Sequence, residues 1–221
     1  PETGFLWGKK ADGSWSSDHS DPTNFGDEFD EANAFQSLWM VALDIDALAA
    51  AYGGKEKLVL RLVELFEKGK EDFDQLDPAD FLKSSGMRPY YWGGNEPDMH
   101  AAYLFALLGR PDLCQKWVAW ARDNLYGPGA DGLPGNDDGG TLSTWYLFSA
   151  LGFYPLPGSD RYVIGAPLFP EATVAVPGGS FTVVAEGVSA TNLYVQSVTL
   201  DGAPLDKPEL RHADLKAGGT L

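Results

Sequence analysis

The sequence contains little cysteine and histidine, the residues that form disulfides and bind transition metals. It has one cysteine, Cys114, and three histidines among 221 residues. A single thiol cannot form an internal disulfide or a thiolate zinc cluster. No run of 18 or more apolar residues occurs, so no transmembrane helix is expected. The stretch Pro1 to Gly4 has no charged region followed by an apolar one, so it is not expected to act as a signal peptide.

Basic charge is also scarce. The chain carries 16 Lys and Arg against 32 Asp and Glu, for a formal net charge of −16. Such a surface repels phosphates, so neither nucleic acid nor an anionic membrane is expected as a partner. Three catalytic signatures are missing as well: a Gly-rich phosphate loop, His-Glu-x-x-His and Gly-x-Ser-x-Gly. Their absence disfavours nucleotide hydrolysis, zinc-peptidase chemistry and serine-hydrolase chemistry.

What is abundant is apolar and aromatic surface. Hydrophobic residues make up 44% of the chain and aromatic residues 13%, with seven Trp. A chain of this composition collapses around a core and is not disordered. The length fits one domain or one and a half.

Apolar spacing predicts helices in the first two thirds of the chain. Leu38, Val41, Ile45 and Leu48 recur at intervals of three and four, as on one helical face. Residues 1–30 and 69–96 read as irregular because Gly, Pro and acidic residues dominate them. The helices expected in this way span residues 31–52, 55–68 and 97–108, a stretch that begins at Pro111, and residues 141–151.

The pattern changes after Gly158. Alternating β-branched residues predict strands at 173–176, 180–185 and 193–200. The predicted organisation is therefore a helical region, residues 1–158, followed by a β-rich segment, residues 159–221, that packs on it. Helix pairs joined by long polar loops favour hairpins arranged in a ring, with the loops gathered on one face.

Three loop-to-helix junctions concentrate carboxylates, amides and aromatic rings: the first junction (29–39), the second junction (90–100) and the third junction (131–140). One interpretation is structural, because Asp30, Asp98 and Asp138 could each be a helix N-terminal acid. Their co-occurrence indicates a sugar site instead. Aromatic faces bind sugar rings, carboxylate and amide oxygens suit Ca²⁺, and two carboxylates on different loops suit cleavage of a glycosidic bond.

The histidines give weaker signals. His19 is interpreted as solvated in an Asp/Ser loop, and His212 as a surface residue of the tail. His100 lies one helical turn after Glu96, so the two share a face. Two readings of His100 stay open: it lines the site, or it is a hydrogen-bonded residue within the helix.

At these junctions the sequence resembles glycoside hydrolase family 92, the calcium-dependent exo-acting α-mannosidases. The similarity continues through Tyr162 to Phe169 and Asn192 to Ser197, so it covers essentially the whole chain. The blocks that carry it are Glu31-Ala32-Asn33-Ala34-x-Gln36-x-x-Trp39, Gly94-Asn95-Glu96-Pro97, Gly135-Asn136-Asp137-Asp138, Ser143-x-Trp145-Tyr146 and Gly152-Phe153-Tyr154-Pro155.

The resemblance implies a fold, a substrate and a location. The fold would be mainly α with a β tail: part of an (α/α)6 toroid catalytic domain followed by short antiparallel strands. Family members are longer, so the remaining N-terminal part, a β-sandwich and the rest of the toroid, would be a structural partner. The substrate would be a mannose-containing glycan, such as an N-glycan. The location would be extracellular, periplasmic or on the surface of a bacterial cell.

The resemblance also implies residue roles in an inverting, single-displacement hydrolysis. Glu31 would be the general acid and Asp138 the general base, assisted by Asp137 or Asn136. Because Asp137 and Asp138 are adjacent, like charge is expected to raise the pKa of one of them. Ca²⁺ would bind at Asn95 and Glu96 and hold the 2- and 3-hydroxyls of mannose. The substrate-binding residues implied are Asn136, His100, Gln36 and Trp92.

The sequence departs from the family pattern at several positions. Val41-Ala42-Leu43-Asp44 stands where Val-Pro-His-Asp is usual, and Met99 where a His is common. These changes concern the leaving-group side and leave the linkage preference open. Three alternatives to an α-mannosidase remain: a carbohydrate-binding remnant without turnover, a member that acts on mannosyl phosphate, and another toroid glycosidase or lyase.

Overall fold

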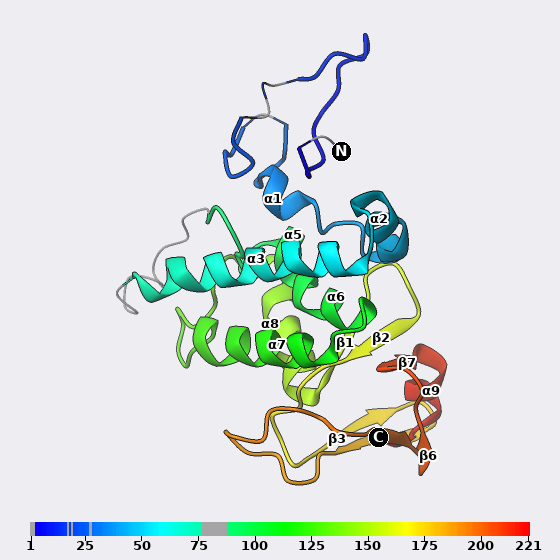
Figure 1. Cartoon of the computed structure of the whole chain (residues 1–221). Helices are drawn as coiled ribbons and strands as arrows, with labels where there is room; N and C mark the ends of the chain where they lie inside the picture. The colour runs from blue at the N-terminus through cyan, green and yellow to red at the C-terminus, as the bar shows by residue number, and fades with distance from the viewer. Residues whose placement is uncertain (1–2, 17, 19, 27, 77–87) are drawn as a thin grey trace.

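The computed structural model describes residues 3–16, 18, 20–26, 28–76 and 88–221. Helices form the body of the molecule, and short strands gather at the end that carries the C-terminus (Figure 1). The expectation of a mainly helical chain with a β-rich tail is therefore confirmed. No helix among the described residues is long and apolar enough to cross a membrane.

The helix expected over residues 31–52 is broken. It consists of α1 (Ala34–Ser37), a 3-10 turn (Ala42–Asp44) and α2 (Ile45–Tyr52). Side chains that bond to the backbone cause the breaks. Asn33 accepts a hydrogen bond from the N–H of Gln36, and Asp44 accepts one from the N–H of Ala47. Residues of this type start new helices in place of continuing old ones, although the apolar spacing runs through the gap.

The next helix, α3 (Lys55–Asp74), is longer than expected. The final turns of α3 lie within residues 69–96, a segment that was expected to be irregular because acidic residues dominate it. Glu71 and Asp74 are exposed, and Lys70 pairs with Asp74 at 2.5 Å, whereas Asp72 is half-buried. Gly69 is buried, with Tyr91 so close that a Cβ there would stand 2.7 Å from the Cβ of Tyr91. Residues 77–87 of that segment lie outside the described residues.

The helix expected over 97–108 is two helices, α5 (Glu96–Met99) and α6 (Ala101–Leu107), which meet at His100. The next two, α7 (Pro111–Leu125) and α8 (Thr141–Leu151), occur as expected. The helix α6 packs against α7, and α7 against α8. Trp39, Trp117 and Trp145 are the largest side chains buried among these helices.

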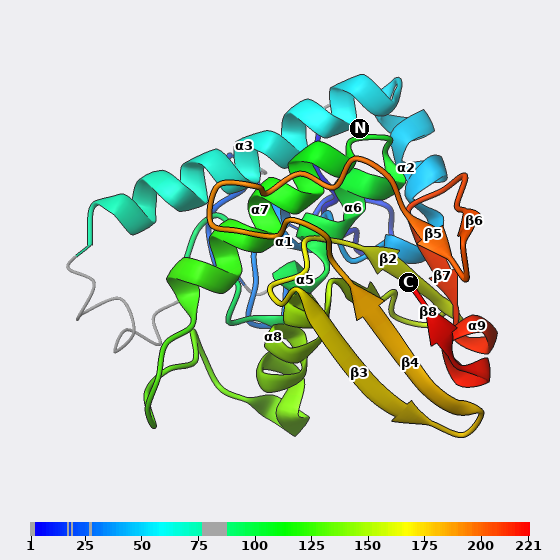
Figure 2. The same cartoon turned by 90° about the horizontal axis from the view of Figure 1, so that it is seen from below.

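The β-rich end contains two three-stranded sheets and a hairpin, seen from below in Figure 2. The β3–β4 hairpin agrees with the prediction. The expected strand 193–200 is paired only at its last two residues, and six elements were not anticipated: β1, β2, β6, β7, β8 and α9. The strands are β1 (Phe153–Pro155), β2 (Arg161–Ile164), β3 (Glu171–Val176), β4 (Gly179–Val184), β5 (Thr199–Leu200), β6 (Ala203–Pro204), β7 (Glu209–Arg211) and β8 (Gly219–Thr220), with α9 at His212–Ala217.

The first sheet has the order β1-β2-β7 and is antiparallel throughout, whereas in the order β3-β4-β8 the last pair is parallel. Two apolar cores result, a large one among the helices and a small one around Phe153 and Phe181. The strands β1 and β2 contribute to both, because Tyr154 and Val163 point into the helical core. The division at residue 158 stays a prediction, since these two strands lie on either side of it.

Candidate active site

The first and second junctions are joined by side-chain amides that donate to backbone carbonyls. Asn95 Nδ2 lies 2.8 Å from the carbonyl oxygen of Glu31. Gln36 Nε2 donates to the carbonyls of Arg88 and Tyr90 at 2.6 and 2.8 Å. Asn33 Nδ2 donates to the Pro89 carbonyl at 3.0 Å. Segments more than fifty residues apart are thus held in fixed register.

The second and third junctions meet through their backbones. A Cβ added at Gly94 would collide with the Pro134 carbonyl, and one added at Gly135 would collide with the Gly94 carbonyl. The helix that follows the third junction is also bonded to the second: the indole Nε1 of Trp145, on α8, donates to the Met99 carbonyl at the end of α5 over 2.7 Å. The three junctions therefore converge, as the sequence argument requires of one site.

Glu31 is exposed and has an unusual backbone. Its φ is +49°, in the left-handed region that residues other than glycine rarely adopt. Asp201 is the other described non-glycine residue in this region, at φ +50°, and the β5–β6 hairpin turn accounts for it. Holding Glu31 there costs about 1–2 kcal/mol. Backbone of this kind is typical of functional sites.

The third junction contains two carboxylates in different settings. Asp137 accepts hydrogen bonds from the Ser143 N–H at 2.9 Å and the Ser143 hydroxyl at 2.5 Å. These bonds hold its pKa below the ordinary aspartate value. The expected rise from like charge is therefore not what governs Asp137, which stays ionised and anchors the start of α8. Both side chains are exposed, but both carboxylate oxygens of Asp137 accept hydrogen bonds from Ser143, which leaves Asp138 as the candidate to meet a solvent molecule.

Asn95 and Glu96 stand side by side at the start of α5. The Asn95 side chain is nearly buried, whereas Glu96 is exposed. Both offer the oxygen ligands that hard cations such as Ca²⁺ prefer. Among the residues that the structure describes, no three His, Cys, Asp or Glu side chains gather closely enough to hold a metal ion. The two residues fit Ca²⁺ as a partial set, since the ion takes six to eight oxygens.

Asp98 has a setting that sequence reasoning missed. The side chain is fully buried, and its Oδ2 accepts a hydrogen bond from the Trp92 N–H at 2.7 Å. Burial raises the pKa of this carboxyl to about 8. The bond closes the loop that carries Asn95 and Glu96. The only sequence signal was an acid in the first turn of a helix, which usually marks an exposed residue.

Two residues expected to contact sugar are buried in the structure. Gln36 has no exposed surface, and its amide nitrogen is committed to two backbone carbonyls. His100 is 7% exposed, and its Nε2 lies 2.6 Å from the Trp39 carbonyl. Burial lowers the pKa of His100 and keeps the ring neutral. Both contacts favour a supporting role over contact with sugar.

The remaining expectations have mixed outcomes. Asn136 is exposed beside Asp137, and Trp92 is half-buried against the Gly94 backbone. Their assignment to sugar binding stays a prediction. His212 is on the surface as expected, where it bonds to the Tyr162 hydroxyl at 3.0 Å. His19 lies outside the described residues.

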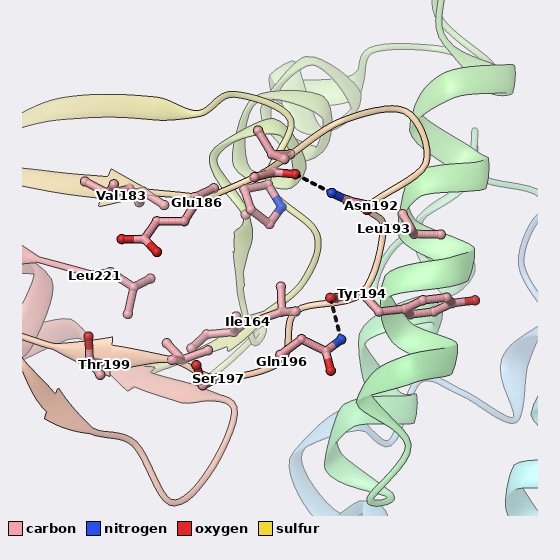
Figure 3. A pocket seen from close by; sticks show the side chains of 18 of the residues that line it. Ile164, Val183, Glu186, Asn192, Leu193, Tyr194, Gln196, Ser197, Thr199 and Leu221 are labelled. Carbon is pink, nitrogen blue, oxygen red and sulfur yellow. Dashed lines mark hydrogen bonds between the residues drawn. The ribbon is translucent and has the colours of Figure 1, made fainter.

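A cavity among the described residues lies elsewhere. It has a volume of about 930 Å³ and sits between β4 and the extended segment 185–199, as Figure 3 shows. The polar side chains that line it bond locally: Asn192 donates to the Gly187 carbonyl, and Gln196 to the Tyr194 carbonyl. No residue of the three junctions lines it. We place the site at the junctions because the carboxylates and amides converge there and not around this cavity.

Comparison with known proteins identifies the family of the chain. The sequence pattern of the Glycosyl hydrolase family 92 catalytic domain matches residues 1–221. A secreted glycosidase of Arthroderma benhamiae, described as uncharacterized, is 28% identical over 203 residues. The match covers 90% of this chain and 24% of that protein.

Solved structures are similar over the whole chain. A family 92 α-mannosidase from Bacteroides thetaiotaomicron is 35% identical with a TM-score of 0.82, covering 100% of this chain and 28% of that one. An inverting mannosidase of the same family and organism is 35% identical with a TM-score of 0.84, covering 100% and 30%. The chain thus spans less than a third of the length of these relatives. The match over the full sequence shows that this chain belongs to glycoside hydrolase family 92.

Proposed function

We propose that the protein containing this chain is an exo-acting α-mannosidase that removes terminal α-linked mannose from glycans with inversion at the anomeric carbon. The observation that carries the proposal is the convergence of the three junctions. Glu31, the Asn95–Glu96 pair and the Asn136–Asp138 run are far apart in sequence, yet neighbouring backbones and side-chain amides join them. Titles of similar structures name mannosidases, one of them inverting.

The proposed reaction uses two carboxyl groups. Glu31 donates its proton to the glycosidic oxygen as the bond from that oxygen to the anomeric carbon breaks. Asp138 accepts a proton from a water molecule whose oxygen bonds to the same carbon from the opposite face. The products are mannose of inverted configuration and an alcohol. Asp137 holds the turn that carries Asp138, and general acid and base groups of this kind each contribute about 10²–10⁴-fold.

Asn95 and Glu96 are the residues of this chain that would hold Ca²⁺. The ion, when bound, would supply positive charge that orients the sugar hydroxyls. Asp98 and Asn95 keep the loop in place from below through their bonds to Trp92 and Glu31. We also propose that the protein is secreted, which the description of the Arthroderma benhamiae relative supports.

The test is hydrolysis of α-mannobioses by the intact protein, followed by NMR of the first anomer released. We expect β-mannose, loss of activity on EGTA treatment, and recovery with Ca²⁺ in preference to Zn²⁺. Release of α-mannose would contradict inversion, and full activity without metal would contradict the role of calcium.

The alternatives give different results in the same assay. Binding of mannosides without turnover at any pH would indicate a carbohydrate-binding remnant. Cleavage of mannosyl phosphate but not of mannobiose would indicate a phosphodiester-type substrate. Activity on other sugars alone would indicate a different toroid glycosidase or lyase.

A further inference from the structure

The amide of Asn95 has two ends with different chemistry. Its nitrogen can only donate hydrogen bonds and its oxygen can only accept them or bind a cation. In the structure the nitrogen is used, because Nδ2 donates to the Glu31 carbonyl at 2.8 Å. The oxygen is therefore the end that remains to meet a cation. One side chain thus connects the proposed acid to the proposed ion.

The position of the acceptor matters because of the Glu31 backbone. At φ +49° the residue occupies a sparsely populated conformation that its surroundings must maintain. The direction of its carbonyl and the direction of its side chain are set by the same backbone angles. A hydrogen bond that fixes the carbonyl therefore also fixes where the carboxyl group can reach.

Asn95 is itself firmly placed. The residue is 5% exposed, and its backbone N–H donates to the Trp92 carbonyl at 3.0 Å. Trp92 is in turn bonded to the buried Asp98. A side chain with so little freedom transmits a change at one end to the other end.

We infer that Asn95 couples the cation to the catalytic acid: its oxygen binds Ca²⁺ and its N–H₂ group holds the left-handed backbone of Glu31 in the position for proton donation. Asn95 is in this respect a positioning residue for Glu31. The inference rests on the proposed function, and it adds a link between ion binding and acid placement that a simple ligand would not provide.

The simpler view is that Asn95 is a ligand alone. An exchange to aspartate separates the two views, because Asn95→Asp keeps an oxygen for the ion and removes the N–H donor. A misplaced acid slows substrates with poor leaving groups most, since an activated leaving group departs without protonation. The diagnostic quantity is the ratio of kcat/KM for an aryl mannoside to kcat/KM for mannobiose.

The experiment uses the intact protein in three forms: wild type, Asn95→Asp and Asn124→Asp. Asn124 is the matched control, because its Nδ2 also donates to a backbone carbonyl, that of Trp120 within α7, at 2.8 Å, and its side chain is exposed. Ca²⁺ binding is measured by calorimetry and by Tb³⁺ luminescence. Rates are compared at ion concentrations that give equal occupancy.

We expect Asn95→Asp to bind Ca²⁺ and to raise the ratio about tenfold or more, because a small displacement of a catalytic group costs up to about 10²-fold. Hydrogen exchange at Ala32 should slow on Ca²⁺ addition in wild type and not in Asn95→Asp. The Asn124→Asp protein should match wild type in both measurements.

Two outcomes would overturn the inference. An unchanged ratio with the ion bound would show that the N–H bond does not place the acid. Failure of the wild-type protein to bind Ca²⁺ at any concentration would show that the oxygen holds no ion. If wild type itself hydrolyses no mannoside, the proposed function fails, and the exchange measurement at Ala32 still decides whether ion and backbone are coupled.

Discussion

The junction region and the segment 185–199 are built in opposite ways. At the junctions, amide side chains from one segment bond to backbone carbonyls of another, as Asn95 does with Glu31 and Gln36 with Tyr90. Segment 185–199 runs around a cavity of about 930 Å³ and is tied to the helical body at Gln115, whose Oε1 accepts from the Val195 N–H at 3.0 Å. The comparison indicates that fixed loop geometry is concentrated where the proposed chemistry takes place.

The largest effect should come from the exposed carboxylate that nothing else replaces. Asp138→Asn removes the proposed base while keeping its size, so turnover of mannobiose by the intact protein should fall by about 10²–10⁴-fold. Circular dichroism should show an unchanged fold. If Asp138→Asn keeps more than half of the wild-type rate, Asp138 is not the base. The proposed chemistry would then no longer distinguish the junction region from segment 185–199.

A smaller effect is expected from a buried link between junctions. Trp145→Phe deletes the indole N–H that donates to Met99, and kcat/KM should fall by about tenfold as the second and third junctions shift. Trp117→Phe is the matched control, because Trp117 is equally buried and no described residue accepts a hydrogen bond from its Nε1. Equal losses of activity in both variants, with equal losses of melting temperature, would show that packing alone matters.

The third effect is on stability and depends on pH. The pKa of Asp137 is lowered on folding by its bonds to Ser143, so its contribution is present above the ordinary aspartate pKa and disappears as pH falls through the folded value. At pH 7, Asp137→Ala should lower the melting temperature by a few degrees. The difference from wild type should shrink as the pH falls below the ordinary aspartate pKa. Asp131→Ala, an exposed acid in the same loop, serves as the charge control, and a difference that persists at low pH would argue against this origin.

The smallest effect on activity is expected from a change at segment 185–199. Gln115→Ala removes the acceptor for the Val195 N–H, so hydrogen exchange in residues 193–197 should become faster. The rate of mannobiose hydrolysis should remain within a factor of about two, because the bond that is lost joins α7 to segment 185–199 and not to a junction. A large loss of activity would mean that the two regions are mechanically connected.

The helix ends expected at residues 52 and 151 agree with the structure, and each is followed by a glycine, Gly53 or Gly152, that adopts left-handed φ. The prediction failed where a side chain competes with the helix. The periodicity of residues 38–48 passes through a break made by Asp44, and spacing alone does not reveal which polar side chain turns back to the backbone. The sequence also could not predict how many residues of 193–200 pair with another strand, since pairing depends on the tertiary position of a neighbouring strand.

For the site, residue types indicated three segments that the structure brings together, but not which of their residues face solvent. Gln36 and His100 were expected to bind sugar, and both are buried. Asp137 and Asp138 are adjacent and chemically identical, yet only the former is tied to Ser143. Such differences arise from tertiary contacts, here the Arg88, Tyr90 and Trp39 carbonyls.

The contact between Gly94 and Gly135 also bears on how this enzyme family could be re-engineered. Each glycine occupies the space that a side chain on the other loop would need, and either Cβ would meet backbone that cannot swing aside. If one loop alone were replaced by that of a relative with a side chain at this position, the second and third junctions would be pushed apart. Chimeras that aim at a new linkage preference should therefore take residues 90–100 and 131–140 together from the same relative.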